Sequence, residues 1–539
     1  KQLESNESRA DMFVSAFVDG DQWSDVVNFI DKMSKVNKQQ VVDFANKYFA
    51  DNYALVYKRM GKDPNEKKMD KPSITPIVMN RDSVSSFLKE IQASKVTPIE
   101  PVFLDFNKDM QKFTAKSDIE VLYKKNDMND LFQMTYVFDM GSQNDKALST
   151  AFSYMEYLGT SKKSLAEINK EFYRLACSFS VHPGMKRTYV MLSGLQENMP
   201  KAMQLFEEIL AGAQVDADAY KNYAADILKK RADAKLNQSS NFSQLLNYAM
   251  YGENSPSKNI LSEKELTEMD PQKLVDCIHK FNSYKHRIMY YGPATQEEVT
   301  SIINQYHNVP EQLVDVPAPA YDYQYQPTNE NKVYFAEYDA KQLYFTGISN
   351  FEKQYDAALQ PTVSMYNEYF SGEMNSIVFQ EMREARSLAY SSYAFITSPS
   401  YKEYPYIFRS FIATQNDKMI DAMKAFDEII NNMPESEKAF KLAQEGTISR
   451  LRTERITGMD VLWEYIDLQD KGISEDPRKD LFQKAQTLTL KDVKDFQQKW
   501  VKDRKYTYCV LGHEKDLDMK SLEKYGKITK LSQKDIFGY

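Results

Sequence analysis

The sequence has few residues that could build metal sites or disulfide frameworks, with only three cysteines and five histidines among 539 residues. The cysteines lie far apart and form no CxxC pair, which argues against both a disulfide framework and a zinc ribbon. No two histidines have the i, i+4 spacing with which one helix presents two ligands to a metal ion. The three cysteines are Cys177, Cys277 and Cys509, and the five histidines are His182, His279, His286, His307 and His513. We therefore expect this chain to bind neither a metal ion nor a cofactor.

Motifs and charge patterns of other protein classes are also missing. The net charge is −8 and basic residues form no stripe, so we expect no nucleic-acid partner. No apolar run approaches the roughly 18 to 20 residues that span a bilayer, so we expect no transmembrane segment. The sequence contains no GxSxG, P-loop or GxGxxG motif. It begins with neither an initiator Met nor a signal peptide, which fits a truncated or processed product and leaves a periplasmic or cell-envelope location open.

A pattern of a helix, a short turn and a strand closed by glycine occurs three times. Each copy has an N-capping residue, an Asp six residues later, a Lys four residues after the Asp, an adjacent aromatic and a closing Gly. The copies are Asn37, Asp43, Lys47, Tyr48 and Gly61; Asp270, Asp276, Lys280, Phe281 and Gly292; and Thr489, Asp495, Lys499, Trp500 and Gly512. Helix-strand pairs that end in Gly are common, so chance is the competing explanation, but the shared offsets argue against it.

The spacing of the three aspartates, 43 to 276 and 276 to 495, indicates a repeating domain of about 220 residues. Each full unit begins with two apolar runs that predict a β-hairpin, starting at Val121 and at Val333. Stretches with apolar residues near helical spacing follow. This order predicts α+β domains with a largely antiparallel sheet and helices packed on one face.

The repeat and the local composition divide the chain into five parts. We expect residues 1–61 to be the C-terminal tail of a preceding domain whose body is absent, because only 42 residues precede the first Asp of the repeat. Residues 62–104 and 309–331 contain several prolines and predict linkers. Residues 105–308 and 332–539 are the two full domains.

One stretch, "VFQEMREARSLAYSSYAF" (378–395), combines a helical first half with a strand-like second half. It places Arg383 and Tyr390 seven residues apart across the junction. A guanidinium and a phenol there could donate hydrogen bonds to carbonyl oxygens of an extended peptide, or to the oxyanion that forms when such a carbonyl is attacked. Both residue types are also common at surfaces and domain contacts, so a structural role is the alternative.

With these motifs the sequence resembles, over nearly the whole chain, the pitrilysin/insulysin family of zinc metallopeptidases, the inverzincins. The resemblance implies that the first domain of the intact protein carries an H-x-x-E-H zinc motif, and that the second half closes over it like the other shell of a clam. It makes residues 1–61 the end of the second domain and residues 62–104 the connection between the halves. Residues 105–308 and 332–539 are then the third and fourth domains.

The resemblance implies different roles for the two full domains. In the third domain "SYMEY" (153–157) stands where the zinc motif would be, so Glu156 is kept while Ser153 and Tyr157 replace both histidines. Without imidazole ligands no metal can activate water, which implies a catalytically silent domain. In the fourth domain "REARSLAY" places Arg383 and Tyr390 on the family's substrate-binding pair, with a serine at 387 instead of the usual glycine.

The function implied by the resemblance is that of the C-terminal half of a zinc metalloendopeptidase. This half would enclose peptide substrates in a chamber and contribute Arg383 and Tyr390 to a zinc site on an absent N-terminal half, joined covalently or associated after cleavage. The chain alone is expected to be inactive. One alternative is a non-catalytic core or peptide-binding scaffold subunit of the same fold. Another is a heterodimer in which a separate chain supplies the zinc, although the tail at 1–61 implies fusion to an earlier domain.

Overall fold

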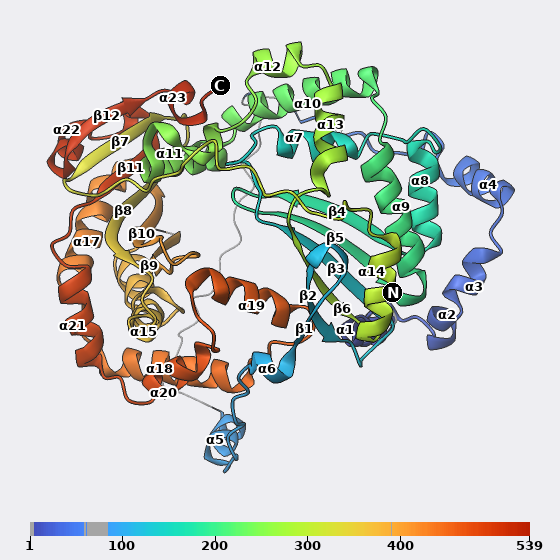
Figure 1. Ribbon diagram of the computed structural model, residues 1–539. Coiled ribbons are helices and arrows are strands. Elements are labelled where there is room, and N and C mark those ends of the chain that lie inside the picture. The colour runs from blue at the N-terminus through green and yellow to red at the C-terminus, as the bar shows by residue number, and fades with distance from the viewer. Residues whose placement is uncertain (1–4, 59–60, 62–84, 390) are drawn as a thin grey trace. The chain divides into compact units, whose positions relative to one another are not determined.

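Two six-stranded β-sheets follow one another along the chain (Figure 1). The computed structural model describes residues 5–58, 61, 85–389 and 391–539. The chain divides into two compact units, residues 2–98 and residues 99–539, and both sheets belong to the second unit. The first sheet contains β1 (Gln111–Thr114), β2 (Glu120–Lys125), β3 (Leu131–Phe138), β4 (Ser178–Pro183), β5 (Thr188–Leu195) and β6 (Arg287–Gly292). The second contains β7 (Lys332–Glu337), β8 (Gln342–Gln354), β9 (Ser391–Thr397), β10 (Pro405–Gln415), β11 (Thr507–Gly512) and β12 (Lys527–Leu531).

In each sheet, the strand that ends the repeat lies between the two strands that open the unit. The order is β1-β2-β6-β3-β5-β4 in the first sheet and β12-β7-β11-β8-β10-β9 in the second. β6 runs parallel to β2 and antiparallel to β3, so that Ile288 lies opposite both Val121 and Tyr136. β11 is inserted between β7 and β8 in the same way. The hairpins predicted from Val121 and Val333 are therefore wrong.

The local sequence is compatible with a hairpin of β2 and β3 and also with a third strand between them, which explains why the hairpin prediction is wrong. Strands that are two places apart in a sheet are separated by about 10 Å. The five residues between β2 and β3, 126–130, can span that distance as readily as they can form a hairpin loop. Only the long-range pairing with β6 decides between the two, and the sequence around the turn carries no information about it.

Most strand pairs are antiparallel, which confirms the predicted α+β class. Helices between and after the strands complete each half. In the first half these are α6 (Phe106–Asp109), α7 (Leu148–Met155), α8 (Leu165–Arg174), α9 (Met199–Gly212), α10 (Ala217–Lys235), α11 (Gln238–Tyr251), α12 (Glu263–Glu268), α13 (Gln272–Phe281) and α14 (Gln296–Tyr306). In the second half they are α15 (Gln360–Ser371), α16 (Ile377–Phe379), α17 (Met419–Asn431), α18 (Glu437–Thr453), α19 (Asp460–Lys471), α20 (Arg478–Ala485), α21 (Leu490–Trp500), α22 (Met519–Leu522) and α23 (Gln533–Phe537).

One face of each sheet packs against helices of its own half, and the other face receives a helix from the opposite half (Figure 1). On the first sheet, Leu462 and Ile466 of α19 pack against Met289 of β6. On the second sheet, Leu245 of α11 packs against Cys509 of β11. All five of these side chains are fully buried. Successive strand residues point to opposite faces, and apolar residues occupy both faces of each sheet. Both faces therefore need a layer of helices to cover them.

A buried ion pair joins α19, the second-half helix that covers the first sheet, to that sheet. The two terminal nitrogens of Arg187, next to β5, donate to the two carboxylate oxygens of Asp470 at 2.5 and 2.7 Å. The Arg187 and Asp470 side chains are only 11% and 13% exposed. A bidentate guanidinium-carboxylate pair of this kind fixes orientation as well as distance.

The first compact unit contains the first copy of the repeat. Its helices are α1 (Asn6–Asp19), α2 (Trp23–Val27), α3 (Phe29–Ser34), α4 (Lys38–Tyr48) and α5 (Ser86–Ala93). The repeat helix α4 is exposed on its apolar side, with 58% exposure at Val41 and 57% at Phe44. In the other two copies the matching helices bury Leu274, Phe281, Val493 and Phe496 to 5% exposure or less. No strand is assigned in 50–58, because an extended segment without a neighbouring strand has no partner for its backbone groups.

The caps predicted for the repeat helices are confirmed in two of three copies. Asn37 and Thr489 each form a capping box at the start of α4 and α21. In the middle copy the helix begins after Pro271, and Asp270 stands one residue further out, where its Oδ1 accepts from the backbone N–H of Gln272 at 3.0 Å. Among the described residues, no helix has the length and apolar character needed to cross a bilayer.

Candidate functional site

Arg383 lies in an unusual helical turn at the start of the predicted substrate-binding segment. Residues Gln380–Ala385 form a π-helical turn directly after α16, a conformation that occurs mostly as single turns and often at functional sites. The Arg383 side chain is 41% exposed, with its guanidinium carbon 5.1 Å from the ring centroid of Phe379 and its Nε 4.0 Å from a carboxylate oxygen of Glu384. Tyr390, its predicted partner, lies outside the described residues.

Ser387, which stands where the resembled family has glycine, adopts a left-handed backbone conformation. Its φ is +49°. Non-glycine residues are disfavoured there by roughly 1–2 kcal/mol, because Cβ approaches the following carbonyl oxygen. The N–H of Ser387 donates to the carbonyl oxygen of Arg383 at 3.2 Å, and that of Leu388 donates to Met382 at 3.0 Å. The turn between Arg383 and Tyr390 is thus one that glycine would form with less strain.

Two contacts hold this turn against the rest of the second half. Arg386 donates to a carboxylate oxygen of Glu428 on α17 at 2.8 Å and pairs with Glu381 at 3.5 Å. The hydrogen bond to Glu428 is the main reason why the pKa of Arg386 is raised. The hydroxyl of Thr414 on β10 donates to the carbonyl oxygen of Leu388 at 2.5 Å. The segment that presents Arg383 is therefore anchored to both a helix and a strand.

The strand after this segment, β9, is an edge strand whose outer side is covered by α15. The side-chain amide of Asn367 donates to the carbonyl oxygen of Ile396 at 2.9 Å and accepts from its N–H at 2.8 Å. The N–H of Ala394 donates to the hydroxyl of Ser371 at 2.9 Å. Asn367 thus takes the place of a neighbouring strand, which is one way in which proteins protect a sheet edge.

The degenerate zinc-motif positions lie together at the end of α7. Ser153 is half-buried, while Glu156 and Tyr157 are exposed, Tyr157 to 45%. Tyr223 of α10 lies against them: its ring centroid is 5.4 Å from that of Tyr157, and its hydroxyl forms a hydrogen bond with Ser153. Burial is the main cause of the raised pKa of Tyr223.

A lysine lies close to the degenerate zinc-motif positions. Lys230 of α10 places its ammonium 2.7 Å from a carboxylate oxygen of Asp226, and this hydrogen bond is the largest cause of its raised pKa. The phenols of Tyr157 and Tyr223 act on the same ammonium more weakly. Across the described part of the chain, no group of three His, Cys, Asp or Glu side chains is placed to hold a metal ion. The arrangement offers phenols and an ammonium group instead of imidazoles.

The sequence does not predict a largely buried chain of two histidines and a glutamate in the first half. Nε2 of His286 lies 2.8 Å from Nε2 of His307, and Nδ1 of His307 lies 2.6 Å from Oε1 of Glu207. The other oxygen of Glu207 accepts from the side-chain amide of Asn282 at 2.7 Å. His286 directly precedes β6, Glu207 lies on α9 and His307 directly follows α14, so no local spacing could have indicated their contact.

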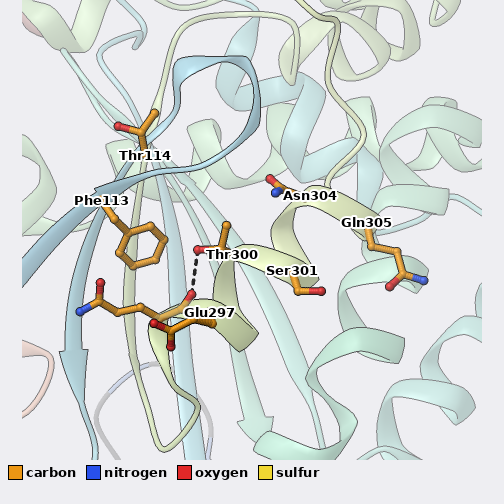
Figure 2. A pocket seen from close by; sticks show the side chains of 8 residues that line it. Phe113, Thr114, Glu297, Thr300, Ser301, Asn304 and Gln305 are labelled. Carbon is orange, nitrogen blue, oxygen red and sulfur yellow. Dashed lines mark hydrogen bonds between the residues drawn. The ribbon is translucent and has the colours of Figure 1, made fainter.

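A shallow cavity of about 700 Å³ lies between β1 and α14 (Figure 2). Its lining consists mainly of amide and hydroxyl side chains, with the ring of Phe113 on one side and Glu297 as the acidic group. The hydroxyl of Thr300 donates to the backbone of its own helix, to the carbonyl oxygen of Gln296, at 2.7 Å. None of the residues predicted from the sequence to form a site lines this cavity.

This chain matches a family model over part of its length, and its fold is similar to that of solved structures. Residues 269–446 match a family model, from the repeat helix α13 through the linker to α18. The match is to the peptidase M16 inactive domain. It confirms the resemblance to the pitrilysin-type peptidases that was drawn from the sequence. No curated protein matches the sequence.

Solved structures with the fold of M16 inactive domains cover most of the chain. A peptidase M16 inactive domain from Pseudomonas fluorescens is 18% identical, with a TM-score of 0.59 over 75% of this chain and 98% of that one. A protease from Helicobacter pylori is 13% identical, with a TM-score of 0.56 over 77% of this chain and 100% of that one.

A larger protein shows the same fold in one part of its length. The periplasmic protease PqqL from Escherichia coli is 11% identical, with a TM-score of 0.60 over 90% of this chain. This chain spans only 52% of PqqL. At such identities the likeness shows a shared fold and nothing about substrates.

Proposed function

We propose that this chain is the C-terminal, non-zinc half of a zinc metalloendopeptidase. In this proposal residues 1–61 are the tail of a second domain, 62–104 the connection between halves, 105–308 a catalytically silent third domain, 309–331 a linker and 332–539 the fourth domain. The chain encloses peptide substrates together with an absent N-terminal half, which binds the zinc ion. Arg383 and Tyr390 reach the substrate from the fourth domain.

The observation that carries this proposal is the contrast between the three copies of the repeat. Two copies insert a central strand into a six-stranded sheet and bury the repeat helix. The first copy has the same capped helix, yet Val41, Phe44 and Tyr48 are more than half exposed. Apolar residues at these positions are explained if a preceding domain supplies the sheet against which α4 packs. The match to about half the length of PqqL supports the same division.

The geometry around Arg383 supports its proposed role. A half-exposed guanidinium on an anchored π-helical turn can donate to substrate carbonyl oxygens, because the segment is fixed while its tip is solvent-accessible. Tyr390 follows the left-handed turn at Ser387 and would complete the pair. The phenols and ammonium around Ser153, Glu156 and Tyr157 support a silent third domain, since none of these groups replaces the two missing imidazole ligands.

A second candidate function is a non-catalytic core or peptide-binding scaffold of the same fold. It is favoured by the description of the matching family model as an inactive domain. The two candidates differ in what precedes residue 1: a half with the zinc motif in the first case, and none in the second. A periplasmic or cell-envelope location would suit either, as it does PqqL.

The test is to purify the native protein from its source and to measure its intact mass and zinc content together. We expect the chain to occur in one polypeptide, or in one complex, with a zinc-bearing half of similar size, and peptide hydrolysis to follow the zinc. A native species limited to these residues, free of zinc and still able to cleave peptides, would overturn the proposal. A complete native protein without zinc and without peptidase activity would establish the scaffold instead.

A further inference from the structure

A second cavity, of about 540 Å³, lies in the second half between α17, the loop before β11 and the turn after α22. On α17 its lining residues Ile420, Lys424, Asp427 and Asn431 follow one another at intervals of three or four, so they share one face of the helix. None of the residues proposed to bind substrate or to mark the lost zinc motif lines it.

The carboxyl group of Asp427 is half-buried in this cavity and has hydroxyl neighbours. The hydroxyl of Tyr508 donates to its Oδ1 at 3.5 Å, and Tyr525 forms a second hydrogen bond to it. Burial raises the pKa of Asp427 to about 6, and the two phenols only partly offset this effect. No basic side chain of the described residues forms an ion pair with it. A carboxyl group of this kind exchanges its proton near neutral pH, which ordinary surface aspartates do not.

The other charged groups of the cavity are mostly basic. Lys424, Lys505 and Lys524 are exposed at its lining, and within the described residues none of the three is within ion-pair distance of a carboxylate. Arg504 is already used, since its Nε donates to Ser349 at 2.9 Å and a terminal nitrogen donates to the carbonyl oxygen of Asn350 at 2.7 Å. Asp503 is the second acidic residue of the lining. In a chain with a net charge of −8, this concentration of lysines favours an anionic ligand.

We propose that this cavity binds an oxyanion that can carry a proton, of the class of inorganic phosphate and phosphomonoesters. The lysines attract the anion, and Asp427 shares one proton with one of its oxygens. That proton can come from either partner, because phosphomonoesters titrate near pH 6 and inorganic phosphate keeps at least one proton throughout the neutral range. Sulfate, which carries no proton at this pH, would bring its oxygen lone pairs against those of an ionised Asp427. Once Asp427 is ionised, above about pH 6, the cavity therefore selects inorganic phosphate over sulfate.

The shared proton makes the affinity depend on pH in a defined direction. The phenols of Tyr508 and Tyr525 contact Asp427, and Tyr506 lies beside it. The charged groups that share the cavity with it are Lys424, Lys505, Lys524, Arg504 and Asp503. None of the three phenols loses a proton around pH 6, since burial raises the pKa of each of them further. As the pH rises above about 6, Asp427 and a phosphomonoester both become fully ionised and repel each other, whereas inorganic phosphate keeps one proton as HPO4²⁻ and can still share it with Asp427. The affinity for a phosphomonoester should therefore fall between about pH 6 and pH 8, and the affinity for inorganic phosphate should fall less.

The experiment is calorimetric titration of the full chain with inorganic phosphate, glycerol 2-phosphate and sulfate, at about pH 6 and about pH 8. The K424A/K524A double variant should weaken phosphate binding at least about tenfold, because each lysine supplies a charge-assisted hydrogen bond. The matched control, K438A/K441A, removes two exposed lysines from α18 and should leave binding unchanged. Tighter binding of glycerol 2-phosphate would assign the site to phosphomonoesters, and tighter binding of inorganic phosphate would assign it to the free ion.

The Asp427→Asn variant tests the shared proton separately. Its amide group donates a hydrogen bond at every pH, so sulfate should now bind about as tightly as phosphate, and the fall in affinity for glycerol 2-phosphate between pH 6 and pH 8 should become smaller. Thermal unfolding of each variant establishes that it is folded. The proposal is overturned if no anion binds up to about 10 mM, which corresponds to roughly 3 kcal/mol. It is also overturned if native protein at about pH 8 binds sulfate as tightly as inorganic phosphate, or if both double variants lose binding equally.

Discussion

The Nε2 atoms of His286 and His307 lie 2.8 Å apart, with Glu207 beyond one ring and the carbonyl oxygen of Tyr284 beyond the other. Each of the three contacts in this chain, 2.6 to 2.8 Å long, requires one proton between its two heavy atoms. Three protons are one more than a carboxylate and two neutral imidazoles carry. A fourth proton would put an N–H on both of the facing Nε2 atoms, so that two donors would point at each other.

We predict that this chain lowers the stability of the protein in acid. Burial, and secondly the charge of His307, lower the pKa of His286 to about 3, whereas an unfolded histidine titrates near 6.5. Between these values the unfolded state binds one more proton, so the free energy of unfolding falls by about 1.4 kcal/mol per pH unit as the pH drops below 6.5. Above 6.5 this contribution is fully present.

Chemical denaturation of native protein and of His286→Gln, at several pH values from about 7 to about 4, measures the effect. The difference between the two stability curves should shrink as the pH falls, because glutamine does not titrate. His182→Gln is the control, since His182 is exposed on the edge strand β4 and its loss should leave the slope unchanged. Parallel curves for native protein and His286→Gln would show that His286 does not titrate as its burial requires.

We predict that Ser387→Gly stabilises the second half. At a φ of +49° the serine side chain is strained, and glycine removes that strain at the cost of a more flexible unfolded chain. The net gain should be on the order of 0.5–1 kcal/mol in the free energy of unfolding. Ser391→Gly, in β9, is the matched control and should destabilise by a similar amount, because its backbone is an ordinary strand. Equal losses in both variants would contradict the left-handed turn.

The ion pair between the halves should be far more sensitive than ion pairs at the surface. Asp470→Asn leaves the guanidinium of Arg187 buried with only the exposed Asp139 as its acidic partner, which we expect to cost about 3–5 kcal/mol in the free energy of unfolding. Asp495→Asn breaks the exposed pair with Lys491 on α21 and should cost less than about 1 kcal/mol. Similar losses of both variants, measured by denaturant titration, would mean that the Arg187–Asp470 pair does not hold α19 on the first sheet.

In the complete peptidase that we propose, Tyr390→Phe should lower kcat without a matching loss of stability. Removing one donor to a reacting carbonyl oxygen typically costs about a hundredfold or more in kcat. Tyr393→Phe is the control, because Tyr393 lies on β9 and is 39% exposed, outside the proposed pair. Equal kinetics for both variants would remove Tyr390 from the substrate site.

The features that the sequence predicted correctly are those encoded by nearby residues. The capping boxes at Asn37 and Thr489 depend on residues three apart, and the helix-strand repeat shows itself through fixed offsets. The α+β class followed from the order of periodic segments. Family resemblance added the zinc-motif positions, and the structure places Ser153, Glu156 and Tyr157 together at one helix end.

The features that it did not predict depend on pairings between distant residues. The place of β6 between β2 and β3 is set by contacts over more than 150 residues, as is that of β11 in the second sheet. The contact of His307 with Glu207 joins residues 100 positions apart. The apolar residues Leu245 and Leu462 have ordinary helical spacing, and nothing in that spacing tells which sheet they cover.

Each sheet is covered on one face by a helix from the other half, the first sheet by α19 and the second by α11. This arrangement has a consequence for synthesis of the chain on the ribosome. The strands of the first sheet are complete once Gly292 has emerged, but the helix that covers its second face spans residues 460–471. At a typical rate of about 5–20 residues per second, that face stays open to the cell for roughly ten to thirty seconds. During this interval Leu122, Val137 and Met289 form an uncovered apolar surface, so the nascent first half is a natural client for a chaperone.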